Sequence, residues 1–263
     1  MGKIAFSAFT KPFTKESPEE LGRLLLGLGF DAMEFCLRDG YQVEPADAVA
    51  KFPAFVKQMK GLGLDVIGVA APLTESVFAG CQAAGIPFIR TLIVLDLKLG
   101  FDGAVAQEKK KLEPAVKLAE KYGVALGIQH HFGPFINSTM ELRHFIEDYP
   151  PQAVGAIWDS AQSILAGEEA EQALSIIFDR LVMVNLKNVY YRRSNGYEAP
   201  TAQFERYFTS GRQGMASWPR ILNYLVEHSY SGPITLTHEY SDEGRVVELL
   251  REDLDYARSL LVK

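Results

Sequence analysis

The chain lacks most of the features that mark a secreted, membrane or nucleic-acid-binding protein. Its 263 residues include only two cysteines, Cys36 and Cys81, which form no Cys-x-x-Cys pattern, so neither a disulfide framework nor a zinc knuckle is expected. No run of about 18 apolar residues occurs, and the segment MGKIAFSAFTKPF contains no signal-peptide core. These absences predict a cytoplasmic protein without a membrane segment.

Positive charge is also scarce, since 27 lysines and arginines stand against 33 acidic residues, giving a net charge of −6. Nucleic-acid binding depends mostly on clustered basic residues, and the one basic run, at 109–111, lies within a helical pattern. We therefore expect no nucleic-acid partner. A Gly-rich phosphate turn is missing after the first predicted strand, which argues against an open dinucleotide-binding sheet and a nucleotide cofactor.

Short segments rich in β-forming residues alternate regularly with helical patterns. Strands are predicted at 3–8, 32–37, 65–70, 88–94, 124–129, 154–159, 182–187 and 233–238. Helices are predicted at 17–29, 45–61, 75–84, 104–122, 139–149, 168–180, 217–229 and 243–261. The first helix is the clearest, because Ser17, Pro18 and Glu20 form a capping box with proline at the first helical position. Eight strand-helix units predict an α/β fold, a single-domain (β/α)₈ TIM barrel over residues 1–263.

One connection is much longer than the others. Residues 188–215 follow the seventh predicted strand and are rich in Tyr, Phe, Arg and Gly. A connection of this length in a compact domain is usually functional, which suggests a lid or a binding loop on the catalytic face. The aromatic residues at 190–208 equally suit a contact in a homodimer, and both interpretations stay open.

Polar residues gather at the strand ends, where barrels carry their chemistry. Alternation along the seventh strand turns Asn185 and Lys187 toward the barrel interior. The same phase brings further polar residues to this mouth: Glu34, Gln129, His131, Asp159, Thr237 and Glu239. An unpaired buried polar group costs about 1–3 kcal/mol, so their convergence predicts a polar binding site for a small substrate. The other histidines are expected behind the strands or on helix surfaces: His130, His238, His144 and His228.

Five segments carry a family pattern. They are FDAMEFCLRDG at 30–40, GVALGIQHHFG at 123–133, VGAIWDSAQSILAGE at 154–168, MVNLKNV at 183–189 and GRQGMASWPRILNYLVEHSYSGPITLTHEYSD at 211–242. The chain resembles, over nearly its whole length, the xylose-isomerase-like barrels of the sugar phosphate isomerase/epimerase family, whose relatives include endonuclease IV-type enzymes. The resemblance implies a TIM barrel that acts on a carbohydrate.

The resemblance also implies a divalent-metal site formed by a Glu, an Asp, a His and a Glu on the last four strands. The matching positions here are Gln129, Asp159, Asn185 and Thr237. Only the aspartate is kept. The family's Asp-x-x-His corresponds to Asp159 with Gln162, and its Lys-Asp corresponds to Lys187 with Asn188. Because glutamine and threonine cannot act as general bases near neutral pH, the family's two-glutamate mechanism is not expected.

Two alternatives follow for the chemistry of the site. His131 and Glu239 each lie two residues beyond a missing glutamate, so a Mn, Zn or Mg ion displaced outward is one possibility. Its predicted ligands are Asp159, Glu239, His131 and Gln129, with Asn185 as a second source of an amide oxygen. In the other alternative the site holds no metal, Lys187 and Arg193 supply positive charge, and Glu239 or His131 handles protons.

The leading hypothesis is an isomerase or epimerase that abstracts a proton beside a sugar carbonyl. Glu239 is predicted to be the base with His131 as its partner, and Asp159 to orient the site or bind the metal. Lys187 and Arg193 are predicted to stabilise the developing oxyanion. The predicted substrate contacts are Glu34, Gln129, Asn185, Arg193, Gln162 and Trp158.

Two other classes remain open: a lyase or hydrolase acting on an oxidised sugar or glycoside in the same pocket, and a non-catalytic sugar-binding relative. A DNA-repair nuclease is the weakest candidate. Three clustered metals would need more ligands than the five histidines of this acidic chain can supply.

Overall fold

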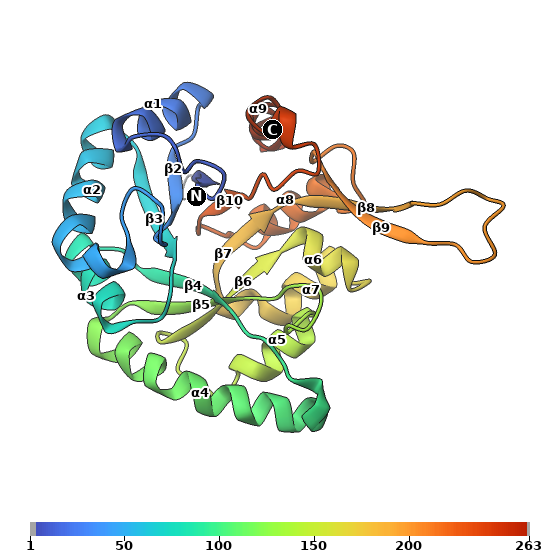
Figure 1. Cartoon of the computed structure of the whole chain (residues 1–263), viewed down its shortest axis with the longest axis horizontal. Helices are drawn as coiled ribbons and strands as arrows, with labels where there is room; N and C mark the ends of the chain where they lie inside the picture. The colour runs from blue at the N-terminus through green and yellow to red at the C-terminus, as the bar shows by residue number, and fades with distance from the viewer. Residues whose placement is uncertain (1–3, 262–263) are drawn as a thin grey trace.

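The computed structural model describes residues 4–261 as a closed barrel of eight parallel strands surrounded by helices (Figure 1). The strands are β1 (Phe6–Phe9), β2 (Ala32–Cys36), β3 (Asp65–Ala70), β4 (Phe88–Leu92), β5 (Ala125–Gln129), β6 (Val154–Asp159), β7 (Leu181–Leu186) and β10 (Ile234–Leu236). Around the barrel their order is β1-β10-β7-β6-β5-β4-β3-β2, and β2 pairs again with β1. Each predicted strand segment supplies one barrel strand, so the predicted fold is confirmed. Lys3, in the first predicted segment, lies outside the described residues.

Helices cover the outside of the barrel. They are α1 (Pro18–Leu28), α2 (Ala48–Leu62), α3 (Glu75–Ala84), α4 (Gly100–Tyr122), α5 (Thr139–Ile146), α6 (Ser160–Leu165), α7 (Ala170–Ile177), α8 (Trp218–Glu227) and α9 (Val246–Ser259), with single 3₁₀ turns η1 (Pro45–Asp47), η2 (Leu97–Leu99), η3 (Phe178–Arg180) and η4 (Glu243–Arg245). Helix α1 begins at the predicted capping box and ends at Gly29, whose φ of 100° favours glycine. Among residues 4–261, no helix is both long and apolar enough to cross a membrane.

The barrel interior is apolar at its amino-terminal end and mixed at the mouth. Phe88, Ile157 and Met183 form the inner apolar layer, and the partly buried Val182 packs against it. The sequence pattern placed Val182 on the outer face, but the pairing of β6 with β7 shifts register there. Gly68 makes room for this layer, since a Cβ at that position would lie 2.3 Å from the Phe88 ring.

The long connection after β7 forms an antiparallel hairpin that extends away from the barrel (Figure 1). Its strands are β8 (Asn188–Arg193) and β9 (Phe204–Thr209). Because residues directly opposite in a hairpin share a face, Tyr191 and Arg206 lie on one face, as do Val189 and Phe208. The ring of Phe208, near the base of the hairpin, packs against Lys187 at the end of β7, so the base of this face overhangs the barrel mouth, while the tip projects outward (Figure 1).

Candidate active site

The carboxyl ends of β5 and β6 place two polar side chains in contact inside the barrel. The Nε2 of Gln129 donates a hydrogen bond of 2.8 Å to Oδ2 of Asp159. The other carboxylate oxygen, Oδ1, accepts the backbone amides of Ala161 at 2.9 Å and Gln162 at 3.1 Å, which makes Asp159 the N-cap of α6. Both oxygens of Asp159 are therefore occupied by N–H donors.

Arg90 on β4, which sequence analysis missed, connects this pair to Glu34 on β2. Its Nη1 donates to Oε1 of Gln129 at 2.9 Å, and its Nε lies 2.8 Å from Oε1 of Glu34. The guanidinium also stacks over the ring of Phe9, 3.8 Å from its centroid. A signal was present in the sequence, because Arg90 interrupts the apolar run FIRTLIV and lies two residues after the inward-facing Phe88, on the same face of the strand. We call the line of Glu34, Arg90, Gln129 and Asp159 the buried chain.

Burial perturbs both carboxyl groups of the buried chain. It raises the pKa of Glu34 to about 7, although Arg90 acts in the opposite direction. Burial likewise raises the pKa of Asp159, opposed by Lys187 and by the α6 backbone amide of Gln162. The fixed cation and the N-cap amides are therefore what favour the ionised carboxylates inside this barrel.

A second set of charges, Lys11, Glu239 and Lys187, lies at the rim, and we call it the rim chain. The Nζ of Lys187 donates a hydrogen bond of 2.7 Å to Oε2 of Glu239, and Lys11 pairs with Oε1 of the same carboxylate. Burial acts to raise the pKa of Glu239, but the two lysines outweigh it and hold the pKa far below its ordinary value. Glu239 is thus a carboxylate at all physiological pH values.

The backbone and ring contacts of Lys187 fix its position. Its amide donates to Ser160 Oγ at 3.0 Å, and that hydroxyl donates to the Lys187 carbonyl oxygen at 2.6 Å. The ammonium group lies 4.3 Å from the ring centroid of Phe208, on the overhanging face of the hairpin. An open groove of about 550 Å³ passes Lys11, Phe208 and Glu239. A ligand can therefore reach the rim chain from solvent.

His131 follows β5 and is partly buried beside the same charges. Its Nδ1 lies 2.9 Å from the carbonyl oxygen of Phe132, so Nδ1 carries the proton and Nε2 the lone pair. Within the described part of the chain, Nε2 makes no hydrogen bond. Burial lowers the pKa of His131 below the ordinary histidine value, with smaller effects from Asp159, Lys187 and Glu239. The ring is therefore a neutral base near pH 7.

Several polar atoms at the barrel centre have no partner in the described chain. Both amide atoms of Asn185 and the hydroxyl of Thr237 are buried without a hydrogen bond, as is Nε2 of Gln162. Oε1 of Gln162, in contrast, accepts the Phe132 amide at 2.9 Å. Each unpaired group costs about 1–3 kcal/mol when it is left unsatisfied. These atoms are available to the hydroxyl or carbonyl oxygens of a substrate.

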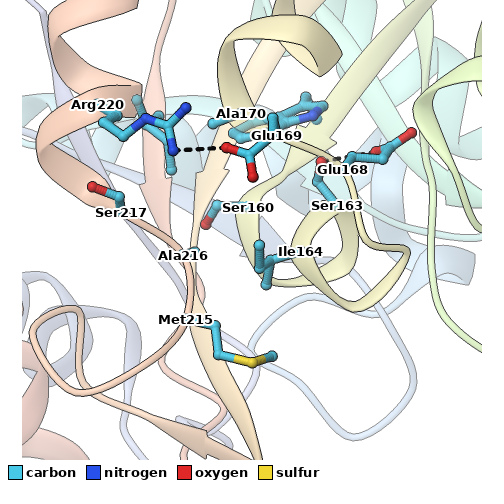
Figure 2. A pocket seen from close by; sticks show the side chains of 12 residues that line it. Ser160, Ser163, Ile164, Glu168, Glu169, Ala170, Met215, Ala216, Ser217 and Arg220 are labelled. Carbon is cyan, nitrogen blue, oxygen red and sulfur yellow. Dashed lines mark hydrogen bonds and ion pairs between the residues drawn. The ribbon is translucent and has the colours of Figure 1, made fainter.

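Two predicted substrate contacts lie elsewhere. Trp158 faces the outer helices and packs in the main hydrophobic core, because it alternates with the inward-facing Asp159. It lines a small pocket of about 90 Å³ between α6 and the residues before α8, where Figure 2 shows Arg220 paired with Glu169. Arg193 belongs to the hairpin, about 16 Å along β8 from the barrel, and donates to Gly196 at 2.7 Å. Neither residue reaches the mouth.

The remaining histidines lie where alternation and helical position predicted them. His130 and His238 are buried behind their strands, and burial lowers the pKa of each to about 4. His144 lies in α5 and His228 follows α8, both on the surface. Of the four, His238 lines the groove that passes the rim chain, and the other three do not.

The predicted metal ligands do not assemble. Within residues 4–261, no group of three or more His, Cys, Asp or Glu side chains could hold a metal ion. The oxygens of Asp159 and Gln129 face N–H donors, and Glu239 faces two ammonium groups. The residues present do not fit a divalent cation.

A closed (β/α)₈ barrel with its polar site at the carboxyl ends of the strands is the architecture in which enzymes of many classes place their chemistry. Residues 23–260 match the family model described as xylose isomerase-like TIM barrel. The chain belongs to this family.

Curated relatives match only part of the chain. Inosose dehydratase from Mesomycoplasma hyopneumoniae (strain 7448) is 25% identical over 152 residues, which are 55% of this chain and 51% of that protein. The chain thus spans about half the length of the curated relatives it matches.

Solved structures match the whole barrel. The 3-keto-D-glucoside 4-epimerase from E. coli has a TM-score of 0.75 at 16% identity, covering 98% of this chain and 100% of the other. The IolI protein with a bound zinc atom has a TM-score of 0.74 at 13% identity, covering 98% and 97%. At these identities the likeness is one of fold.

Proposed function

We propose that this chain is an enzyme that moves a proton at a carbon beside the carbonyl group of a hydroxylated, sugar-like substrate. The observation that carries the proposal is a neutral histidine with a free Nε2 at the same mouth as the lysine-carboxylate pair of Lys187 and Glu239. Enolate-forming reactions need a base for the C–H proton and a cation beside the oxygen on which negative charge develops.

His131 suits the role of the base. Its Nδ1–H donates to a backbone carbonyl, which directs the lone pair of Nε2 away from the chain, and its lowered pKa keeps Nε2 unprotonated near pH 7. In the proposed step, Nε2 takes the proton from carbon and the C–H electron pair moves onto the carbonyl oxygen. His131 then returns the proton to carbon.

Glu239 takes a different role from the one that the sequence suggested. A carboxylate whose pKa is held so low by two lysines is a weak base for a carbon acid. Its contacts instead favour a positioning role, in which it holds the Lys187 ammonium at the mouth. Lys187 then donates to the substrate oxygen as charge develops there.

The unpaired atoms of Asn185 and Thr237 would hold further substrate oxygens. Asp159 and Gln129 support the strand ends through the buried chain rather than by touching a metal. Because the residues present do not fit a divalent cation, no step is assigned to one.

The fate of the enolate divides isomerisation or epimerisation from dehydration. Return of the proton to the neighbouring carbon, with the hydroxyl proton of that carbon passing to the former carbonyl oxygen, gives an isomer. Protonation of the same carbon from the opposite face, by a donor on that face such as water, gives an epimer, and both products keep the mass of the substrate. Loss of a neighbouring hydroxyl, which leaves as water with one added proton, gives a dehydrated product. The curated inosose dehydratases favour dehydration as the second candidate.

The test is proton exchange in D₂O on a panel containing an inosose, a 3-keto-D-glucoside and a ketose phosphate, followed by NMR and mass spectrometry. The wild type is expected to exchange one C–H position beside a carbonyl in a member of the panel. His131→Asn keeps a donor near the Phe132 carbonyl but removes the base, and should slow exchange by roughly 10²–10⁴-fold.

His144→Asn, on the surface of α5, is the matched control and should behave as wild type. Exchange by His131→Asn at the control rate would exclude His131 as the base. Stabilisation of the wild type by a sugar without any exchange would favour the non-catalytic binder instead.

A further inference from the structure

Arg90 is one of two deeply buried cations at the mouth, the other being Lys187. The side chain of Arg90 is only 8% exposed, and its partner Glu34 is fully buried. A buried ion pair is weak evidence for stability, because apolar residues of similar volume are often as stable or more so. The pair therefore calls for an explanation beyond packing.

Arg90 occupies, directly or through Gln129, two oxygens that could otherwise serve a metal. Oε1 of Gln129 accepts from the guanidinium, which turns the amide nitrogen toward Asp159. Oδ2 of Asp159 is in turn taken by that nitrogen. A divalent cation needs unprotonated oxygen or nitrogen lone pairs directed at it, and here these two side chains present theirs to N–H groups.

The two positions that follow around the barrel continue the pattern. Asn185 and Thr237 are neutral, and Lys187 places an ammonium group on the same side of the mouth. A metal bound here would therefore meet the cations Arg90 and Lys187, while positions 129 and 237 carry neutral side chains where the family pattern has glutamates.

We propose that Arg90 supplies, as a fixed part of the chain, the positive charge that a divalent cation supplies in relatives such as the zinc-bound IolI protein, and that this enzyme is metal-independent. Arg90 is a positioning residue: it holds Gln129, and through it Asp159, while Lys187 meets the substrate. This inference rests on the proposed function, because it assigns Arg90 a role in the same active site, but its test measures metal binding and does not depend on turnover.

The first measurement is the metal content of the wild type purified without chelator, followed by melting with and without EDTA. We expect far less than one equivalent of any divalent metal and no change in Tm. About one equivalent of Mn, Zn or Mg, or a chelator-sensitive Tm, would overturn the inference.

The second measurement restores the family's ligands in two backgrounds. Q129E/N185H/T237E keeps Arg90, and R90M/Q129E/N185H/T237E lacks it. Binding of Co²⁺, followed by its visible absorption, should be at least on the order of 10–100-fold tighter without Arg90, the range by which groups around a metal's ligands change affinity. Equal affinity in the two backgrounds would show that Arg90 does not exclude the metal.

If either combined variant fails to fold, as judged by circular dichroism, the metal content and the melting of the wild type still decide whether the enzyme is metal-independent. A metal-free wild type that exchanges no substrate proton would defeat the proposed function and leave this inference standing. A metal-bound wild type that exchanges protons would defeat this inference and leave the proposed function standing.

Discussion

The buried chain and the rim chain meet at one mouth but differ in how far water reaches them. Every side chain of the buried chain is at most 8% exposed. In the rim chain Lys187 is also only 8% exposed, but Glu239 is 31% and Lys11 47% exposed. In the buried chain, hydrogen bonds tie Arg90 to Gln129 and Gln129 to Asp159, and Glu34 is held by its ion pair with Arg90. In the rim chain Lys187 can exchange a carboxylate partner for a substrate oxygen. The buried chain is therefore expected to hold the strand ends in place, and the rim chain to contact the substrate.

The largest expected effect comes from breaking the buried chain. Arg90→Met leaves Glu34 buried and unpaired, which should cost about 3–5 kcal/mol in the free energy of unfolding. Arg90→Met/Glu34→Met removes both charges and should recover most of that loss. Urea denaturation measures both.

The matched control is Arg23→Met, because Arg23 also pairs with a glutamate, Glu19, but on the exposed surface of α1. It should cost no more than about 0.5 kcal/mol. Similar losses in the free energy of unfolding at Arg90 and Arg23 would mean that the buried ion pair contributes no more to stability than a surface ion pair.

Breaking the rim chain should affect turnover rather than folding. Lys187→Met removes the donor to the developing oxyanion and should lower kcat by roughly 10²–10³-fold, while Glu239 keeps Lys11 and water as partners. Steady-state kinetics on the exchanging substrate, with a thermal melt alongside, measures this. Lys57→Met on α2 is the control. If Lys187→Met lowered the stability of the fold but not kcat, the rim chain would serve folding and not turnover, contrary to this account.

A smaller effect should appear in the pH dependence of stability. Because burial raises the pKa of Glu34 from 4.5 to about 7, the folded chain holds this proton more tightly than the unfolded chain does. The stability so gained is fully present below about pH 4.5 and is lost as the pH rises through about 7. The wild type should therefore lose stability relative to Glu34→Gln over that interval. A constant difference between the two proteins would mean that Glu34 stays ionised throughout.

Alternation explains why much of the mouth was predictable. A period of two residues fixes which side chains of a strand face inward, and it brought Gln129, Asp159 and Asn185 to the interior. The same rule, applied strictly, also places Trp158 outside. Its assignment as a substrate contact was wrong because chain proximity to Asp159 was given more weight than the face of the strand.

Other features needed the three-dimensional structure. The contact of Arg90 with Glu34 joins β4 to β2 past the intervening β3, and no local pattern encodes which inward-facing side chains of different strands meet. Arg193 was misplaced because residues 188–215 were interpreted as an irregular loop. The two β-rich runs at 188–193 and 204–209, separated by a segment rich in turn-forming residues, could have indicated the hairpin. The predicted homodimer contact on this hairpin stays a prediction.

The central claim, metal-independent proton transfer at this mouth, is tested most directly by proton exchange with protein dialysed against EDTA. The account predicts that the chelated wild type exchanges the C–H proton beside the carbonyl at an undiminished rate, and that added Mn²⁺ or Zn²⁺ does not raise it. Exchange that disappears with EDTA and returns with the metal would contradict the account.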